Sequence, residues 1–195
     1  KDLVLYKNIR TLSTSKKPSE LIIHKHQCRD IFSGIDEIVR TYGFTGVEPN
    51  TILMGWSKKE STKEAFIKII RNFQQNNFNS IFLNYDPVRK FGNQRTIDIW
   101  WSGWGTNLVF SIYLIRHLTS MGEWKDSRAR LLVINNDTNL IEIIHKTISG
   151  VLEEYRVNME LKVIDNSVDN YFRDDIISRE SALTDLTIIG FPWEQ

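Results

Sequence analysis

A chain of 195 residues is long for one domain and short for two, so we expect one large globular unit. Hydrophobic residues make up 41% and charged residues 25% of the sequence, which is ordinary for a soluble globular protein and argues against extensive disorder. The formal net charge is +1, so composition predicts no nucleic-acid partner.

Cysteine content and apolar runs restrict the class of protein further. Cys28 is the single cysteine, so the chain has no internal disulfide, no thiolate metal cluster, and a composition that fits a reducing compartment. The longest apolar runs are far below the roughly 20 residues that a membrane-spanning helix needs. Because the sequence starts without methionine or a signal peptide, we expect it to be a piece of a longer polypeptide.

Charge is distributed unevenly along the chain. Residues 1–29 hold seven lysines and arginines against two acids, a net charge of +5, whereas eleven acids face five bases from Glu142 onward. Solvated surface charge explains most asymmetries of this kind, and a partner surface is the alternative. We assign residues 1–19 to a basic arm or linker, or to the end of a preceding subdomain, and residues 20–195 to a single α/β domain.

The first part of the chain predicts three strands and two helices. Apolar runs at residues 21–24, 51–56 and 80–85 predict strands, of which 51–56 is a continuous apolar strand typical of buried parallel sheets. Residues 29–42 predict a helix with an apolar side of Ile31, Ile35, Ile38 or Val39, and Tyr42. Ser61 and Glu64 have capping-box spacing and predict the start of a second helix, whose apolar face is Ala65, Phe66, Ile69, Ile70 and Phe73.

The same alternation continues to the end of the chain. Strands are predicted at residues 96–101, 130–134, 159–164 and 186–190. The helices between them are predicted at residues 106–120, with Leu108, Ile112 and Ile115 buried, from Asp137 or Thr138 to about residue 155, and at residues 169–180. The predicted fold class is therefore α/β, a mostly parallel open sheet with helices on both faces. Trp100, Trp101 and Trp104 fall together and predict a packing centre.

Ligands of open α/β sheets bind beyond the carboxyl ends of the strands, and backbone N–H groups at a helix N-terminus attract anions. This rule selects strand ends at Gly55 and Asp86, and the glycine turn before the helix at residues 106–120. The candidate nucleotide or anion site comprises Gly55, Trp56, Gly103, Gly105, Thr106 and Asn107. Because that turn lacks the third glycine of a dinucleotide motif and the lysine of a P-loop, close packing of strand and helix is the alternative.

Catalytic and metal sites find no positive support in the sequence. His24 and His26 would share one side of a strand, but no third ligand is evident nearby, so we predict no metal. No nucleophile elbow or Cys–His pair is present, so we predict no catalytic residue and no enzyme activity. Asp98 lies in mid-strand between apolar neighbours; burial would raise its pKa, but we expect a hydrogen-bonded structural carboxylate.

Three separated stretches carry recognisable motifs in order. Residues 42–56 contain a glycine-rich loop, Pro-Asn-Thr and a following strand, and residues 95–101 read Arg-Thr-Ile-Asp-Ile-Trp-Trp. Residues 123–130 begin with Glu-Trp-Lys, and residues 184–192 form a closing strand ending in Gly-Phe-Pro. Together these stretches resemble the cytosolic C-terminal domain of cation-chloride cotransporters, the family of sodium-potassium-chloride and potassium-chloride symporters. The family's Asp-Gly-Gly after the Trp-Trp strand is here Gly103-Trp104-Gly105.

The resemblance implies a universal-stress-protein-like fold, of which this chain matches mainly the second half. It also implies a regulatory, dimerising cytosolic domain of a cation-chloride cotransporter or of a related amino-acid-permease-like transporter, at the cytoplasmic face of a membrane. Its partners would be the transmembrane transport domain of the same polypeptide and a second copy, with the basic arm contacting anionic lipid. We predict no cofactor, and a nucleotide at the candidate site is the alternative.

Two alternatives stay open at this point. One is a free-standing nucleotide-binding protein of the universal stress type, for which the candidate site above would hold the nucleotide. The other is a small α/β enzyme, which the missing nucleophile and base disfavour.

Overall fold

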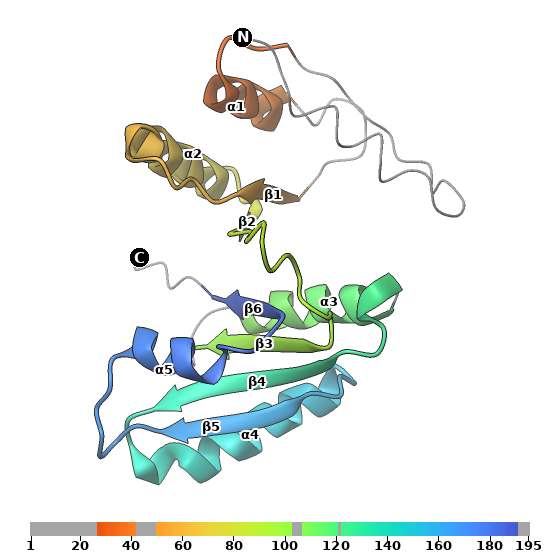
Figure 1. The fold of residues 1–195 in the computed structure, drawn as a ribbon, viewed down its shortest axis with the longest axis vertical. Helices are drawn as coiled ribbons and strands as arrows, with labels where there is room; N and C mark the ends of the chain where they lie inside the picture. The colour runs from red at the N-terminus through yellow and green to blue at the C-terminus, as the bar shows by residue number, and fades with distance from the viewer. Residues whose placement is uncertain (1–26, 42–49, 103–106, 121, 191–195) are drawn as a thin grey trace. The chain divides into compact units, whose positions relative to one another are not determined.

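A computed structural model describes residues 27–41, 50–102, 107–120 and 122–190. The chain divides into two compact units, Lys1–Tyr85 and Asp86–Gln195, each with its own parallel sheet (Figure 1). The basic arm and the strand predicted at residues 21–24 lie outside the described residues. The single domain expected over residues 20–195 stays a prediction. No helix in the described part of the chain is long and apolar enough to cross a membrane.

The first unit contains a β-α-β unit preceded by one helix. Its elements are α1 (Ile31–Thr41), β1 (Thr51–Gly55), the 3₁₀ turn Glu60–Thr62, α2 (Lys63–Gln75) and β2 (Asn79–Leu83). The strands β1 and β2 pair in parallel, which requires a crossover between them, and α2 supplies it. The predicted apolar face of α2 is confirmed, because Phe66, Ile69 and Phe73 form the buried core of this unit.

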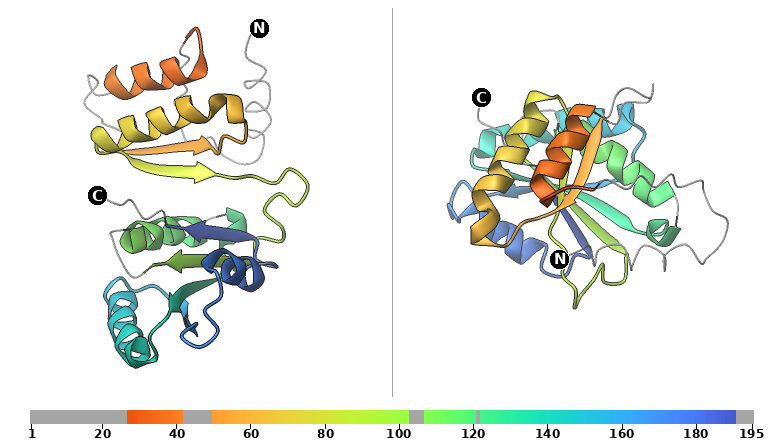
Figure 2. Two further views of the ribbon diagram at one scale, coloured as in Figure 1. Left: turned by 90° about the vertical axis from the view of Figure 1, so that its left-hand side faces the viewer. Right: turned by 90° about the horizontal axis from the view of Figure 1, so that it is seen from above.

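The predictions about burial in the first unit are wrong at two positions. In α1, Ile35 and Val39 pack on the core as predicted, together with Phe32, but Ile31 is exposed. The apolar residues of α1 extend over more than one side of the helix, and only the side that packs on α2 is covered. In β1, Leu53 is 66% exposed, because both helices lie on the same side of the two strands (Figure 2) and alternate residues of a strand face opposite ways.

The capping box predicted at Ser61 and Glu64 is also wrong. The 3₁₀ turn Glu60–Thr62 precedes α2, so Ser61 lies inside a helical turn and Thr62 occupies the N-cap position. Thr62 makes no side-chain capping bond; its hydroxyl donates to the Lys59 carbonyl oxygen at 2.9 Å. At this helix start the 3₁₀ turn supplies acceptors for other backbone groups: the N–H groups of Thr62 and Lys63 donate to the carbonyl oxygens of Lys59 and Glu60.

The second unit is a four-stranded parallel sheet in the order β5-β4-β3-β6. Its elements are β3 (Thr96–Trp101), α3 (Asn107–Ser120), β4 (Arg128–Asn135), α4 (Ile141–Glu154), β5 (Glu160–Asp165), α5 (Arg173–Glu180) and β6 (Leu186–Ile189), with 3₁₀ turns at Gly122–Trp124 and Thr138–Leu140. Figure 2 (left) shows α3 and α4 on one side of this sheet and α5 on the other. The predicted fold class is confirmed.

Side chains of β3 and β4 alternate between the two helical layers. Ile97 and Ile99 pack in one cluster with residues of α3 and α4, whereas Trp100 packs with Leu132 and with Ile176 of α5. Trp100 is 2% exposed, and it faces Leu132 because the two residues are register partners of β3 and β4. This period-2 alternation decides which side chains of the central strand meet α5.

The Asp185 carboxylate joins the start of β3 to the start of β6. Asp185 accepts the backbone N–H groups of Asn93, Arg95 and Thr96 at 3.0, 2.8 and 3.0 Å. Burial raises the pKa of Asp185, but these hydrogen bonds outweigh it and hold the pKa below its usual value. Gly92, at φ +53°, lies directly beside this carboxylate, where a Cβ atom would collide with Asp185 Oδ1.

We predict that Gly92→Ala destabilises the protein by about 2 kcal/mol or more. The substitution adds the cost of a positive φ for alanine, about 1 kcal/mol, and also forces Asp185 away from its three backbone donors. Chemical denaturation followed by circular dichroism measures the loss.

Gly122→Ala is the matched control. Gly122 has φ +69°, but a Cβ atom there would meet nothing within 4 Å, so only the conformational cost of about 1 kcal/mol should appear. Equal losses in the two variants would show that Asp185 yields freely and that its contacts with the loop contribute little.

Candidate functional site

A buried charge lies at the centre of the second unit. Asp98, in the middle of β3, is 0% exposed. Its register partner on β4 is Arg130, whose Nε donates to Asp98 Oδ1 and whose Nη2 donates to Asp98 Oδ2, both at 2.8 Å. A bidentate pair of this kind is among the strongest side-chain hydrogen-bond geometries, and it is required here because an unpaired buried carboxylate is costly.

The connection from α5 to β6 supplies the remaining donors to this carboxylate. The hydroxyls of Ser181 and Thr184 donate to Asp98 Oδ2 at 2.7 and 2.6 Å. The Ser181 hydroxyl also accepts from Trp100 Nε1 at 2.9 Å. Asp98 on β3 is therefore bonded both to β4, through Arg130, and to the end of α5, through Ser181.

The ionised form of Asp98 is the stable one. Burial raises its pKa, but the hydrogen bonds from Arg130, Thr184 and Ser181 and the positive charge of Arg130 together place the pKa below its ordinary value. The pKa of Arg130 is raised in turn, chiefly by its hydrogen bonds to Asp98. The expectation of a hydrogen-bonded structural carboxylate is confirmed, and a saturated ion pair is poorly suited to proton transfer.

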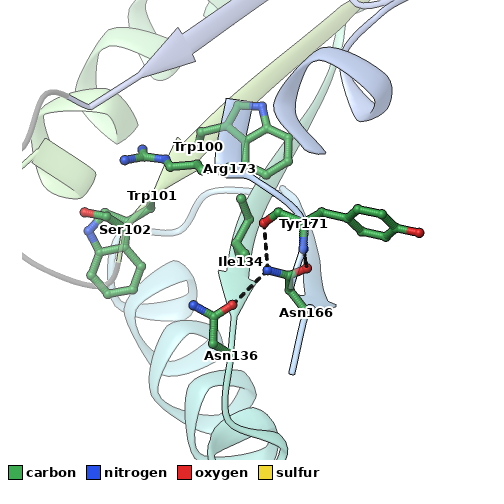
Figure 3. A pocket seen from close by; sticks show the side chains of 8 residues that line it. All are labelled: Trp100, Trp101, Ser102, Ile134, Asn136, Asn166, Tyr171 and Arg173. Atoms are coloured by element: carbon green, nitrogen blue, oxygen red, sulfur yellow. Dashed lines mark hydrogen bonds between the residues drawn. The ribbon is translucent and has the colours of Figure 1, made fainter. Parts of the chain in front are cut away.

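A pocket of about 220 Å³ lies at the carboxyl ends of the strands, on the side of α5. Figure 3 shows the eight residues that line it: Trp100, Trp101, Ser102, Ile134, Asn136, Asn166, Tyr171 and Arg173. They come from the ends of β3 and β4, the connection after β5, and the first residue of α5. This is the edge of the sheet where the sequence predicted a ligand, although with other residues.

Asn166 organises the wall of this pocket. It is 5% exposed, and its amide donates to Asn136 Oδ1 at 3.0 Å and to the Tyr171 carbonyl oxygen at 3.1 Å, while its Oδ1 accepts from the Tyr171 backbone N–H at 2.8 Å. Its own backbone N–H donates to the Asn135 carbonyl oxygen at 2.7 Å. The connection between β5 and α5 is thus held against the end of β4.

The candidate residues of the sequence analysis fall in different places. Gly55 ends β1 and Trp56 follows it in the first unit, where the indole packs edge-to-face on Phe66 and Phe82. Asn107 is the first residue of α3 in the second unit, and a Cβ atom on Gly190 would come within 3.3 Å of its Cβ. The other three candidates, Gly103, Gly105 and Thr106, lie outside the described residues.

Metal ligation has no candidate in the described part of the chain. No group of three or more histidine, cysteine, aspartate or glutamate side chains there could hold a metal ion. The pair considered from the sequence, His24 and His26, lies outside that part.

Comparison with known proteins finds similarity in sequence and in fold to cation-chloride cotransporters. No family model matches the chain. It is 22% identical over 170 residues to potassium/chloride cotransporter 3 of Caenorhabditis elegans, a match that covers 84% of this chain and 15% of that protein. Its fold matches the crystal structure of the cytoplasmic domain of a prokaryotic cation chloride cotransporter, with a TM-score of 0.60 at 13% identity, over 69% of this chain and 54% of that one.

The chain resembles the cytosolic domain of a cation-chloride cotransporter. The recognition made from three motif stretches is therefore confirmed by a match in sequence and a match in fold. The chain spans only 15% of the length of the worm cotransporter, so the similarity concerns one part of such a protein. At this level of identity the structural match shows the shared fold and does not extend to binding residues.

The sequence analysis missed most of the pocket. Asn136, Asn166 and Arg173 each follow a strand or begin a helix, a placement that is the usual signal for a ligand site in an α/β sheet. The signal was applied to the strands before Trp56, Asp86 and Ser102, and not to the two strands that follow. Had it been applied uniformly, Asn136 and Asn166 would have been among the candidates.

We predict that Asp98→Asn lowers the free energy of unfolding by about 3 kcal/mol. Asparagine has the same shape as aspartate, but its amide NH₂ group would face the donors that now bond to the carboxylate. It also leaves the Arg130 charge uncompensated. The cost stays below the upper limit for a broken buried pair because the Arg130 side chain is 29% exposed and keeps part of its hydration. Asp174→Asn, on an exposed position of α5, is the control and should change stability by less than about 0.5 kcal/mol.

The same variant should change how stability depends on pH. A carboxyl with a lowered folded-state pKa stabilises the fold above its unfolded pKa of about 3.9, and that stabilisation is lost as pH falls through the folded value. The native protein should therefore lose stability below about pH 4 to 5, and Asp98→Asn should lose less over the same range. Some slope will remain, since the pKa of Asp185 is lowered too. Identical pH profiles would contradict this assignment of the Asp98 charge.

Proposed function

We propose that this chain is a regulatory, dimerising cytosolic domain of a cation-chloride cotransporter or a close relative, and that it has no enzyme activity. The observation that carries the proposal is the similarity to a potassium/chloride cotransporter over 84% of the chain. The fold supports it independently, because it matches a cytoplasmic domain from another member of the same family. The proposed partner is the transmembrane transport domain of the same polypeptide.

The geometry of the second unit favours contacts with a ligand or a partner over catalysis. Its most buried ionisable group, Asp98, is saturated by Arg130 and two hydroxyls, so it offers no base to a substrate. The pocket at the carboxyl edge of the sheet is lined by two asparagines, an arginine and aromatic residues, and none of its eight lining residues is an acid. Such an edge is suited to ligand or partner contacts.

We predict that the full parent protein carries out potassium uptake that depends on chloride, and that Asp98→Asn lowers it in proportion to the loss of folded domain. The reason is that a regulatory domain must be folded to act on its transport domain. Rubidium uptake in cells that express the parent, with and without chloride, measures the effect, and the amount of protein at the cell surface is quantified alongside.

Asp174→Asn in the same parent is the matched control and should leave uptake unchanged, since its side chain is exposed. A parent without membrane-spanning segments, or uptake that is indifferent to chloride, would overturn the proposal. In that case saturable binding of ATP by the chain would favour the free-standing nucleotide-binding protein.

We predict that the chain self-associates as a symmetric dimer. The described helices of the second unit leave large apolar side chains exposed, among them Tyr113 of α3 and Ile143 of α4, and apolar surface on a rigid element is a common dimer contact. Sedimentation velocity at tens of micromolar should show a dimer that dissociates on dilution. A monomer over the whole range would contradict this prediction, and would mean either that the chain lacks the interface or that the membrane part of the parent holds the two copies together.

A further inference from the structure

The pocket at the carboxyl end of the second sheet carries three polar groups without partners. The guanidinium of Arg173, the amide nitrogen of Asn136 and the hydroxyl of Ser102 line it. Among the described residues none of these three groups has a hydrogen-bond or ion-pair partner. All three donate, whereas none of the eight lining residues is an aspartate or a glutamate, so the free hydrogen-bonding capacity of the pocket favours an acceptor with negative charge.

The orientation of one donor is set by the protein itself. Asn166 donates to Asn136 Oδ1 at 3.0 Å, so the Asn136 amide nitrogen is turned away from Asn166, as Figure 3 shows. Arg173 is the first residue of α5, so its charge adds to the positive end of the helix dipole. Asp174 and Asp175 follow it in the first turn but are exposed and do not line the pocket.

The remaining wall of the pocket is apolar and restricts the size of the ligand. It is formed by Trp100 and Ile134, and by Trp101 at the end of β3, whose side chain packs with the Ile97 and Ile99 cluster on the other face of the sheet. In Figure 3 the ring of Tyr171 points away from these side chains, and the Arg179 guanidinium lies over that ring at 4.3 Å. A volume of about 220 Å³ is below the roughly 300–1,000 Å³ of pockets for drug-sized ligands, which points to a compact body with an anionic head.

We propose that this pocket binds a compact organic anion. Its carboxylate or phosphate is held by Arg173, Asn136 and Ser102, and its planar or apolar body lies against Trp100 and Ile134. The bidentate fork of arginine suits both kinds of anionic head. This proposal does not depend on the proposed function, because binding is measured on the chain itself and chloride-dependent uptake is measured on the parent.

The test uses the 195-residue chain and four probes at constant ionic strength. Benzoate and phenyl phosphate are compact anions with a planar body, benzamide is a neutral analogue of benzoate, and inorganic phosphate lacks the planar body. Binding is followed by tryptophan fluorescence, since Trp100 and Trp101 line the pocket, and by thermal stabilisation. We expect saturable binding of benzoate or phenyl phosphate, and at least about tenfold weaker binding of benzamide and of inorganic phosphate.

Two variants locate the binding. Arg173→Gln should weaken binding of the anionic probe by about tenfold or more, because it removes the only charge that lines the pocket. Arg116→Gln removes the same charge from an exposed position on α3, on the other face of the sheet, and should leave binding unchanged. Ser102→Tyr adds bulk at an exposed lining residue and should abolish binding while the circular dichroism spectrum stays native.

Several results would overturn the proposal. They are absence of saturable binding for both organic anions, equal affinity for benzoate and benzamide, equal affinity for phenyl phosphate and inorganic phosphate, or native affinity in both Arg173→Gln and Ser102→Tyr. Preference for benzoate over phenyl phosphate assigns a carboxylate as the natural head group, and the reverse preference assigns a phosphate monoester. Either preference supports the proposal.

Discussion

The second unit depends on one constraint, that the Asp98 carboxylate is ionised and fully buried in the central strand of its sheet. A charge in that position must be surrounded by donors, and neighbours in β3 cannot supply them because they are apolar. The donors come from β4 through Arg130 and from the connection after α5 through Ser181 and Thr184. The carboxylate therefore fixes the register of the sheet and the position of α5 together.

The two faces of this sheet use different chemistry. Toward α3 and α4 the strands present aliphatic side chains such as Ile97, Ile99 and Leu131, which pack without directional bonds. On the face toward α5, the half of the sheet nearer the amino ends of the strands is polar. There Lys162 of β5 pairs with Glu180 at 2.6 Å. Aliphatic packing tolerates small shifts of a helix, whereas a saturated ion pair does not. These polar contacts therefore set the position of α5, a short helix that buries little apolar surface of its own.

The elements of the fold could be predicted because each is encoded by nearby residues, as the alternation of residues 96–101 and the periodicity of residues 107–120 show. What failed depends on long-range packing. Leu53 is exposed because both helices of the first unit cover the opposite side of β1. The sequence of residues 51–56 does not indicate which side of the strand the helices will cover. The structural role of Asp98 was predictable from its apolar neighbours, but its partners lie 32 to 86 positions away. The pocket likewise combines residues from three separate connections.

The helix α5 connects the buried network to the pocket. Its last residue, Glu180, accepts from Arg130 Nη2 through its backbone oxygen at 3.3 Å and pairs with Lys162, while its first residue, Arg173, lines the pocket. Eight residues of helix span about 12 Å, so the two features lie one helix length apart. Because one helix contributes to both features, a change that displaces α5 from the Asp98 network would also displace Arg173 from the pocket.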